Sequence, residues 1–137
     1  MKKSWTEKFN AKPEIEIKVL DKSYWGYRVG DKMLIPSPTI IQDYINRQNK
    51  GIKLDVATMR DDLALSYGAD FTCPLTTGIF LRIVAEMNFE KYTAGATSES
   101  ICPFWRIIEP TSKLGCKLSF GTELIREMRQ KEKIDLL

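Results

Sequence analysis

The side chains best suited to nucleophilic chemistry in this sequence are its three cysteines, Cys73, Cys102 and Cys116. A cysteine attacks as a thiolate, and a neighbouring histidine is a common base that generates one. The chain contains no histidine. A Ser-His-Asp triad, a Cys-His pair and a zinc site are therefore excluded or strongly disfavoured, and no C-x-x-C spacing is present. We expect neither a metal nor a cofactor.

Cys102 precedes Pro103 and is the one candidate for a catalytic nucleophile in the sequence. Its activation would require a lysine, an arginine or a helix terminus nearby, since no histidine can serve. The default for a free cysteine is a buried, inert thiol. An odd cysteine count without a secretory segment also disfavours disulfides.

Length and composition are those of one globular domain: 137 residues, 43% hydrophobic and 28% charged. The net charge of +3 and the pI near 8.7 permit a nucleic-acid partner without requiring one. No run of apolar residues is long enough to span a membrane, and no apolar segment follows the basic amino terminus. We expect a cytoplasmic protein with no membrane partner.

The first third of the chain alternates in a way that predicts a small antiparallel sheet. Apolar and charged residues alternate over 14–19, which indicates a half-buried strand. Residues 24–29 and 33–35 indicate two further strands, separated by turn residues. Residues 1–12 are polar, and we expect poor order at their start.

Three helices are predicted next, each with a start or stop signal. Ser37 and the proline after it open the first, and Gly51 ends it; Asp55 opens the second, and Gly68 closes it. The third begins at Pro74. The second and third helices with their short glycine-containing turn are a helix-turn-helix candidate, and an αα-hairpin without a nucleic-acid role is the alternative. An apolar line runs along the third helix through Leu75, Ile79, Ile83 and Met87.

The last third of the chain is predicted to contain both strands and a helix. Residues 91–100 are small and polar and indicate a loop, and 105–108 are aromatic and β-branched and indicate a short buried strand. Residues 113–120 indicate one arm of a hairpin. Gly121 then leads into a final helix with apolar residues at helical spacing.

Two segments together suggest a family. Residues 73–80 read Cys-Pro-Leu-Thr-Thr-Gly-Ile-Phe, and residues 101–108 read Ile-Cys-Pro-Phe-Trp-Arg-Ile-Ile. They resemble the DNA-binding domain of the alkylguanine-DNA alkyltransferases (methylated-DNA–protein-cysteine methyltransferases), over roughly residues 33–133. The resemblance implies an α+β, mostly helical, winged-helix-like domain over 33–137, with an amino-terminal β extension over 1–32 and a carboxyl-terminal β-hairpin.

The resemblance also implies that this chain does not carry out the family's alkyl-transfer reaction. The family's Pro-Cys-His-Arg motif corresponds to Pro103, Phe104, Trp105 and Arg106, so the alkyl-accepting cysteine and its activating histidine are both replaced. The tail resembles the family's as well, since Gly121, Leu124, Met128 and Glu132 match its glycine, apolar and terminal Glu-Gly pattern. Two DNA-facing tyrosines of the family are replaced as well, by Val56 and Leu118.

The same resemblance implies a DNA-binding surface on the third helix. Thr76, Thr77 and Gly78 at its start are expected nearest the double-stranded DNA, alkylated or not. Arg82 and Lys113 are candidates for phosphate contacts, with a solvated surface charge as the alternative. For Arg106 we expect a bracing role, in which it bonds backbone carbonyls rather than DNA.

Three functions follow. The first is a non-catalytic, alkyltransferase-like DNA-binding protein that senses alkylated bases in DNA repair. The second is a structural or protein-interaction domain that keeps the fold without binding DNA, with the amino-terminal strands forming a homodimer or partner edge. The third is an alkyltransferase that acts through the displaced Cys102.

Overall fold

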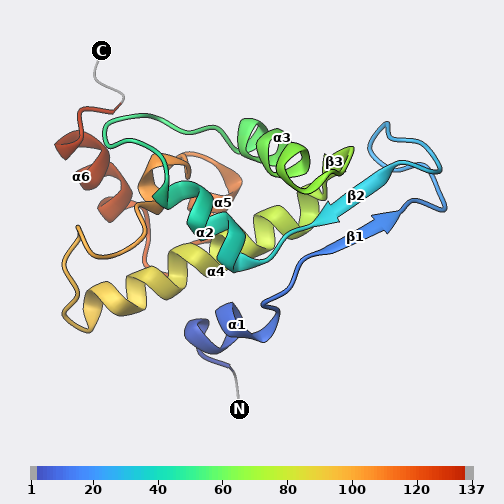
Figure 1. Ribbon diagram of the computed structural model, residues 1–137. Helices are drawn as coiled ribbons and strands as arrows, with labels where there is room; N and C mark the ends of the chain where they lie inside the picture. Colours follow the sequence, from blue (N-terminus) through green and yellow to red (C-terminus); the bar gives the residue numbers. More distant parts are fainter. Residues whose placement is uncertain (1–2, 135–137) are drawn as a thin grey trace.

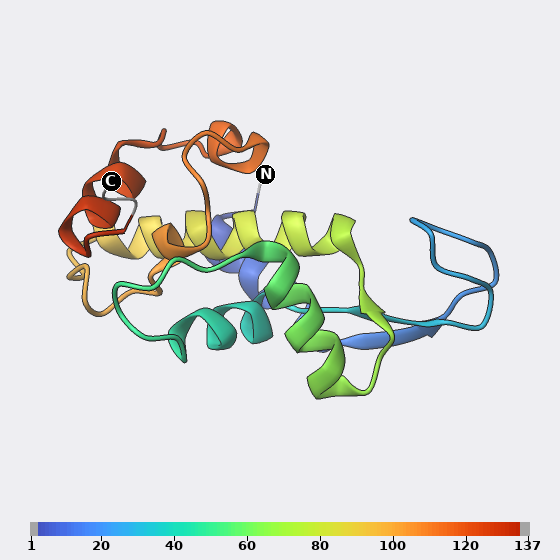
Figure 2. The same cartoon turned by 90° about the horizontal axis from the view of Figure 1, so that it is seen from above.

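A twenty-residue helix, α4, runs through the middle of the molecule, and helices α1 and α2 pack along it (Figures 1 and 2). The computed structural model describes residues 3–134. They form an α+β fold, about half helical, with a small mixed sheet. The elements in chain order are α1 (Trp5–Ala11), β1 (Glu16–Val19), β2 (Lys32–Ile35), α2 (Pro38–Asn46), α3 (Val56–Tyr67), β3 (Phe71–Thr72), α4 (Pro74–Thr93), the 3-10 helix η1 (Phe104–Arg106), α5 (Lys113–Lys117) and α6 (Glu123–Lys131).

The helices with clear capping residues begin where the sequence predicts. The side chains of Ser37 and Asp55 accept hydrogen bonds from the first turns of α2 and α3. Gly68 ends α3 in the left-handed conformation, at φ 72°, which glycine adopts without strain. Pro74 opens α4, as expected. The final predicted helix is also confirmed, as α6.

Residues 5–11 form a helix, α1, that was not predicted from the sequence, whereas residues 1 and 2, at the start where poor order was expected, lie outside the described residues. Ser4 and Glu7 cap α1 reciprocally, since each side chain accepts a hydrogen bond from the other's backbone N–H. Thr6 then donates two hydrogen bonds to Glu90, at 3.1 Å each, and so joins α1 to α4. The capping box of Ser4 and Glu7 is the sequence signal from which α1 could have been predicted.

The sheet has the strand order β1-β2-β3. β1 and β2 are antiparallel, with Ile17 opposite Leu34, and β2 pairs in parallel with the short strand β3, which the sequence did not predict. Helices α2 and α3 form the crossover that a parallel pair needs. The expected domain boundary after residue 32 falls within β2, after the first residue of that strand, and β2 is paired with both β1 and β3.

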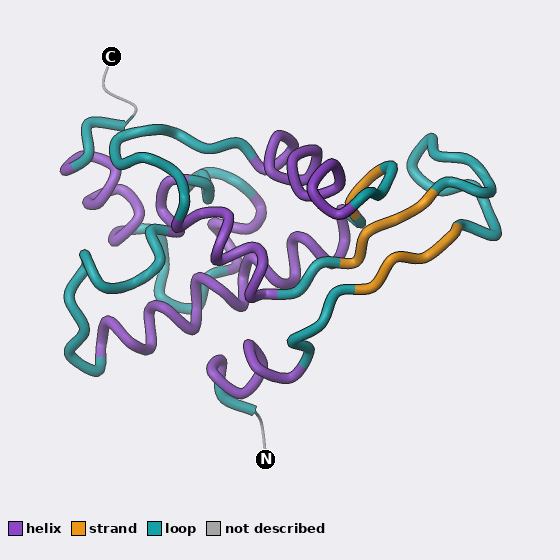
Figure 3. Tube along the Cα trace, viewed as in Figure 1, coloured by secondary structure: helices purple, strands orange, loops and turns teal. Residues whose placement is uncertain are grey.

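The β1–β2 hairpin projects away from the helices (Figures 1 and 3). β2 packs against α3 and buries Leu34, but all four residues of β1 are exposed, so β1 is not half-buried as predicted: Ile17 is 44% exposed and Val19 64% exposed. The strand predicted over 24–29 is a tight turn instead. Trp25 and Gly26 both have positive φ, at 51° and 83°, and the neighbouring Tyr24 and Tyr27 form an isolated bridge.

Two carboxyl-terminal predictions are corrected. The strand predicted over 105–108 is replaced by η1, because a short apolar run fits a fully buried turn as well as a strand. The predicted β-hairpin over 113–120 is absent from the described chain, since residues 113–117 form α5. Ser112 caps this helix, and Gly115 lies so close to the carbonyl oxygens of Glu109 and Pro110 that a Cβ would collide with them.

The core lies between α2, α3, α4, η1 and α6, and its largest fully buried side chains include Trp105, Phe104, Ile41, Leu81 and Ile125. Among the described helices, none combines the length and the apolar character that a membrane span requires.

Candidate functional site

Phe104, which the resemblance places at the nucleophile position, is part of the core. Phe104 has no exposed surface, and its ring lies edge-on to Trp105 and Phe120, with centroids 5.4 and 5.7 Å away. Phe120 in turn stacks on Phe89 of α4, at 4.1 Å. Position 104 therefore faces packed aromatic rings and cannot present a reactive group to a substrate.

The buried carboxylate of Glu132 accepts hydrogen bonds from the polar side chains of the same motif. It accepts the indole N–H of Trp105 at 2.6 Å, the Nε of Arg106 at 2.8 Å and the backbone N–H of Gly51 at 3.0 Å. Burial alone would raise the pKa of the Glu132 carboxyl, but the hydrogen bonds from Arg106, Gly51 and Trp105 hold that pKa below its ordinary value. The side chain is ionised at neutral pH and paired.

Arg106 and Arg129 extend this cluster to neighbouring segments. Arg106 donates to the carbonyl of Gln48, at 3.3 Å, which confirms the expected bracing role. Arg129 donates to the carbonyl of Trp105 at 2.6 Å and pairs with Glu109 at 3.1 Å. The cluster thus joins η1 to α6 and to the loop after α2.

The Cys102 thiol is buried and poorly suited to attack. It lies 3.9 Å from the carbonyl oxygen of Gln42, and the backbone N–H of Cys102 donates to Asn88 at 2.9 Å. Burial raises the pKa of the thiol to about 12, although Arg106 nearby opposes that shift. A thiol with this pKa is almost entirely protonated at neutral pH.

We therefore expect iodoacetamide at pH 8 to alkylate the exposed Cys116 at least about a hundredfold faster than Cys102, because the thiolate is the reactive form. Peptide mass spectrometry over a time course would measure both rates. Buried Cys73 serves as an internal control for slow labelling. Labelling of Cys102 as fast as that of Cys116 would favour the displaced-nucleophile hypothesis.

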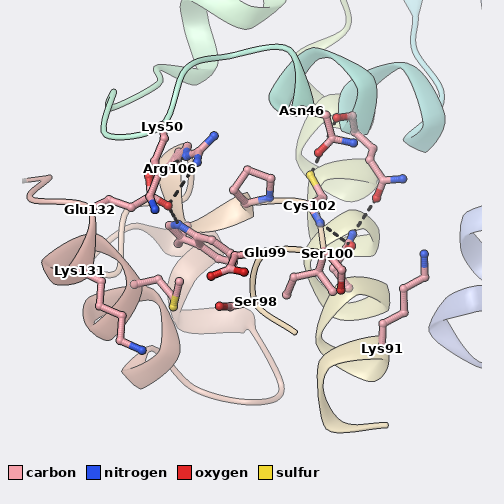
Figure 4. A pocket seen from close by; sticks show the side chains of 16 residues that line it. Asn46, Lys50, Lys91, Ser98, Glu99, Ser100, Cys102, Arg106, Lys131 and Glu132 are labelled. Carbon is pink, nitrogen blue, oxygen red and sulfur yellow. Dashed lines mark hydrogen bonds and ion pairs between the residues drawn. The ribbon is translucent and has the colours of Figure 1, made fainter. Parts of the chain in front are cut away.

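A polar pocket of about 560 Å³ lies beside this cluster, and we call it the α2–α6 pocket (Figure 4). Cys102, Trp105 and Glu132 border it at the inside. Figure 4 shows Lys50, Lys91 and Lys131 on three of its sides. The remaining lining residues come from α2, the end of α4, the loop before η1, η1 itself and α6: Gln42, Asn46, Asn88, Ser98, Glu99, Ser100, Ile101, Pro103, Arg106 and Met128.

A second cavity, of about 500 Å³, lies over the first turns of α4, and we call it the α4 groove. It brings together three of the predicted DNA-binding residues, Gly78, Arg82 and Lys113. Leu75 and Ile79, which the apolar line in the sequence would place in the core, are instead 64% and 50% exposed here. The other lining residues are Trp5, Lys8, Pro74, Ile83, Leu114 and Lys117.

Two further cations and an aromatic ring join the groove from elements that were not predicted. Lys8 and Trp5 come from α1, and Lys117 comes from α5. The Nζ of Lys8 lies 4.1 Å from the centre of the Trp5 ring, and the guanidinium carbon of Arg82 lies 5.2 Å from it. The capping box is a sequence signal for the existence of α1. No pattern in the sequence indicates that α1 packs against α4.

The two threonines expected nearest the DNA, Thr76 and Thr77, are not among the residues that line the α4 groove. Thr77 is fully buried and its hydroxyl donates to the carbonyl of Cys73 at 2.7 Å, so it is not available for a DNA contact in this structure. Thr76 is half-buried, and its hydroxyl oxygen is enclosed without a hydrogen-bond partner among the described residues. The predicted site is thus reduced to Gly78, Arg82 and Lys113, with Thr76 beside them.

The α4 groove and the α2–α6 pocket open on opposite sides of α4. Arg82 borders the first and Lys91 the second, and nine residues separate them, which is about two and a half helical turns. The molecule therefore presents a basic and apolar groove on one side and a polar pocket on the other.

Comparison with protein-family models, with curated proteins and with solved structures gives no match for this chain.

Proposed function

We propose that this chain is a non-catalytic, alkyltransferase-like protein that binds double-stranded DNA through the first turns of α4. The observation that carries the proposal is the α4 groove. It gathers four cationic side chains, from Lys8, Arg82, Lys113 and Lys117, around two exposed apolar ones. As in the resembled family, α4 would enter the minor groove, and the proposal extends to the sensing of alkylated bases.

The chemistry of this surface suits a duplex. Cations around the groove would neutralise phosphates and release counterions, which supplies most of the sequence-independent affinity. Gly78 carries no side chain, so the helix backbone can approach the DNA closely. Leu75 and Ile79 are exposed at the same place, and minor-groove proteins use such apolar side chains as wedges between base steps.

The absence of a transfer reaction is supported by the core around η1. Alkyl transfer needs a thiolate and a base, whereas Phe104 and Trp105 at the two corresponding positions are buried. Glu132 accepts the indole N–H of Trp105 at 2.6 Å, so the side chain at the second of these positions is held in a buried structural cluster.

The test is fluorescence anisotropy of a labelled duplex, with and without an alkylated guanine, at several salt concentrations. We expect binding that weakens with salt. Lys113→Ala with Lys117→Ala should lower the affinity at low salt about tenfold or more and reduce the salt slope by about 2, since each lysine that contacts a phosphate contributes about 1. Both lysines are exposed, so the fold should be unaffected.

A matched control removes two charges elsewhere. Lys22 and Arg28 lie between β1 and β2 in the hairpin loop, and K22A/R28A should leave the affinity nearly unchanged. Preference for the alkylated duplex would establish lesion sensing. Failure of both duplexes to bind at low salt, or equal losses in the two double variants, would overturn the proposal.

The second candidate function is self-association through the β1–β2 hairpin. β1 pairs with β2 alone among the described strands, so its other edge is open. Large apolar side chains are exposed along the same hairpin, namely Ile17, Val19, Tyr24, Trp25 and Val29. Antiparallel pairing of two β1 edges would cover this surface, and sedimentation equilibrium would detect the dimer.

A further inference from the structure

The α2–α6 pocket has no part in the proposed DNA contact, because it opens on the side of α4 opposite the α4 groove. Its walls are built from four separate segments, which helix packing and the Glu132 cluster hold together. The pocket is therefore a preformed cavity in the fold, of a volume that lies within the usual range for small-molecule sites.

The charge around this pocket favours an anion. Lys50, Lys91 and Lys131 surround it and are all exposed. Lys131 also pairs with Glu127 at 3.4 Å, but both side chains of that pair are largely exposed, and such surface pairs contribute little free energy.

Only two carboxylates line the pocket, and one of them is already neutralised. Glu132 is paired with Arg106 at 2.8 Å inside the cluster. Glu99 is the remaining acidic residue among the lining residues, against three lysines. Lysine ammonium groups bind phosphate as compact point charges, and three of them suit a ligand that carries more than one negative charge.

The inner wall supplies hydrogen-bonding groups for the rest of the ligand. Gln42 and Asn46 lie one turn apart on α2, and both line the pocket. The side-chain oxygen of Gln42 accepts a hydrogen bond from Asn88 at 2.7 Å, which fixes this amide and directs its NH₂ group as a donor. Met128 and Pro103 add apolar surface for a ring.

We propose that the α2–α6 pocket binds a mononucleotide, with its phosphate at the lysines and its base and sugar against the α2 amides. A volume of about 560 Å³ accommodates a ligand of this size. Binding there is independent of DNA and makes this protein responsive to a small phosphorylated molecule.

The experiment is isothermal titration calorimetry of the protein without DNA against AMP, GMP, CMP and UMP, with adenosine and inorganic phosphate as separate arms. We expect one-to-one binding of at least one mononucleotide, weaker at high salt. Adenosine should bind at least about tenfold more weakly than AMP if AMP is the ligand, because it lacks the charge that the lysines recognise. If inorganic phosphate binds as tightly as every mononucleotide, the site is a phosphate site only and the proposal fails.

Charge reversal locates the site. K50E/K91E should weaken mononucleotide binding about tenfold or more, because it replaces two cations at the pocket by two anions. K22E/R28E makes the same change of net charge on the hairpin loop and should leave binding unchanged. Equal losses in the two variants, or no binding of any mononucleotide, would overturn the proposal.

The outcome is separable from that of the DNA experiment. K113A/K117A should affect DNA binding alone, and K50E/K91E should change nucleotide binding whether or not DNA binds. Unaltered circular dichroism of each variant shows that a loss comes from the site and not from unfolding.

Discussion

Replacing Glu132 by alanine should lower the free energy of unfolding by about 3–5 kcal/mol, because it leaves a buried guanidinium without its partner. Arg106 would lose its ion pair at 2.8 Å, and the N–H groups of Trp105 and Gly51 would lose their acceptor. Each unpaired buried donor adds a desolvation penalty. Urea unfolding at pH 7, followed by circular dichroism, would measure the loss.

The neighbouring Glu127→Ala is the matched control, since it removes an exposed glutamate from the same helix and should change stability by less than about 0.5 kcal/mol. Removing both charges in R106M/E132L should be milder than E132A, because no unpaired ion remains. Equal stabilities of E132A and E127A would contradict the role of the cluster.

The pH dependence of stability gives a further check on this ion pair. Since the pKa of Glu132 is lowered in the folded protein, its contribution is fully present above the ordinary glutamate pKa of 4.5 and is lost as the pH falls through the lower, folded-state pKa. The difference between the wild type and E132A should therefore shrink in that acid range, whereas the E127A difference should stay small throughout.

The elements that sequence predicts well are those with a local signal at their ends. Ser37 fixes the start of α2, and Asp55 and Gly68 fix the two ends of α3, through caps and a left-handed residue that the structure confirms. The end of α2 carries no such signal, and the helix stops at Asn46, before the predicted stop at Gly51. β3 carries two residues and no such signal, and its pairing depends on where β2 lies. For η1, β-branched and aromatic residues predicted a strand, but these preferences express burial as much as backbone conformation.

The candidate site was predicted in part, and this prediction came from the family resemblance and not from a local pattern. The resemblance singled out Gly78 and Arg82, and both border the α4 groove in the structure. Thr77 was misplaced because α4 is apolar on more than one side, so the sequence left open which face is buried. The contributions of Trp5 and Lys117 depend on how α1 and α5 pack, which no local pattern encodes.

Placing a cysteine at the position that the resemblance assigns to the nucleophile, by Phe104→Cys, should destabilise the protein by about 2–4 kcal/mol and should not produce alkyl transfer. The stability loss follows from the cavity left by a ring that packs fully buried against Trp105 and Phe120. The new thiol would lie in the same apolar surroundings, which favour its protonated form, and the chain has no histidine to deprotonate it. Urea unfolding and intact-mass spectrometry after incubation with a duplex that contains O6-methylguanine would measure the two effects.

Leu65→Cys provides the control for the added cysteine, because Leu65 is 83% exposed on α3. That variant should keep the stability of the parent and react readily with iodoacetamide, whereas the thiol introduced by Phe104→Cys should remain unlabelled until the protein unfolds. A mass gain of one methyl group on residue 104 would show that substrate and a base can reach this position. The position would then be a dormant active site, and the buried aromatic cluster would be the sole block to the reaction.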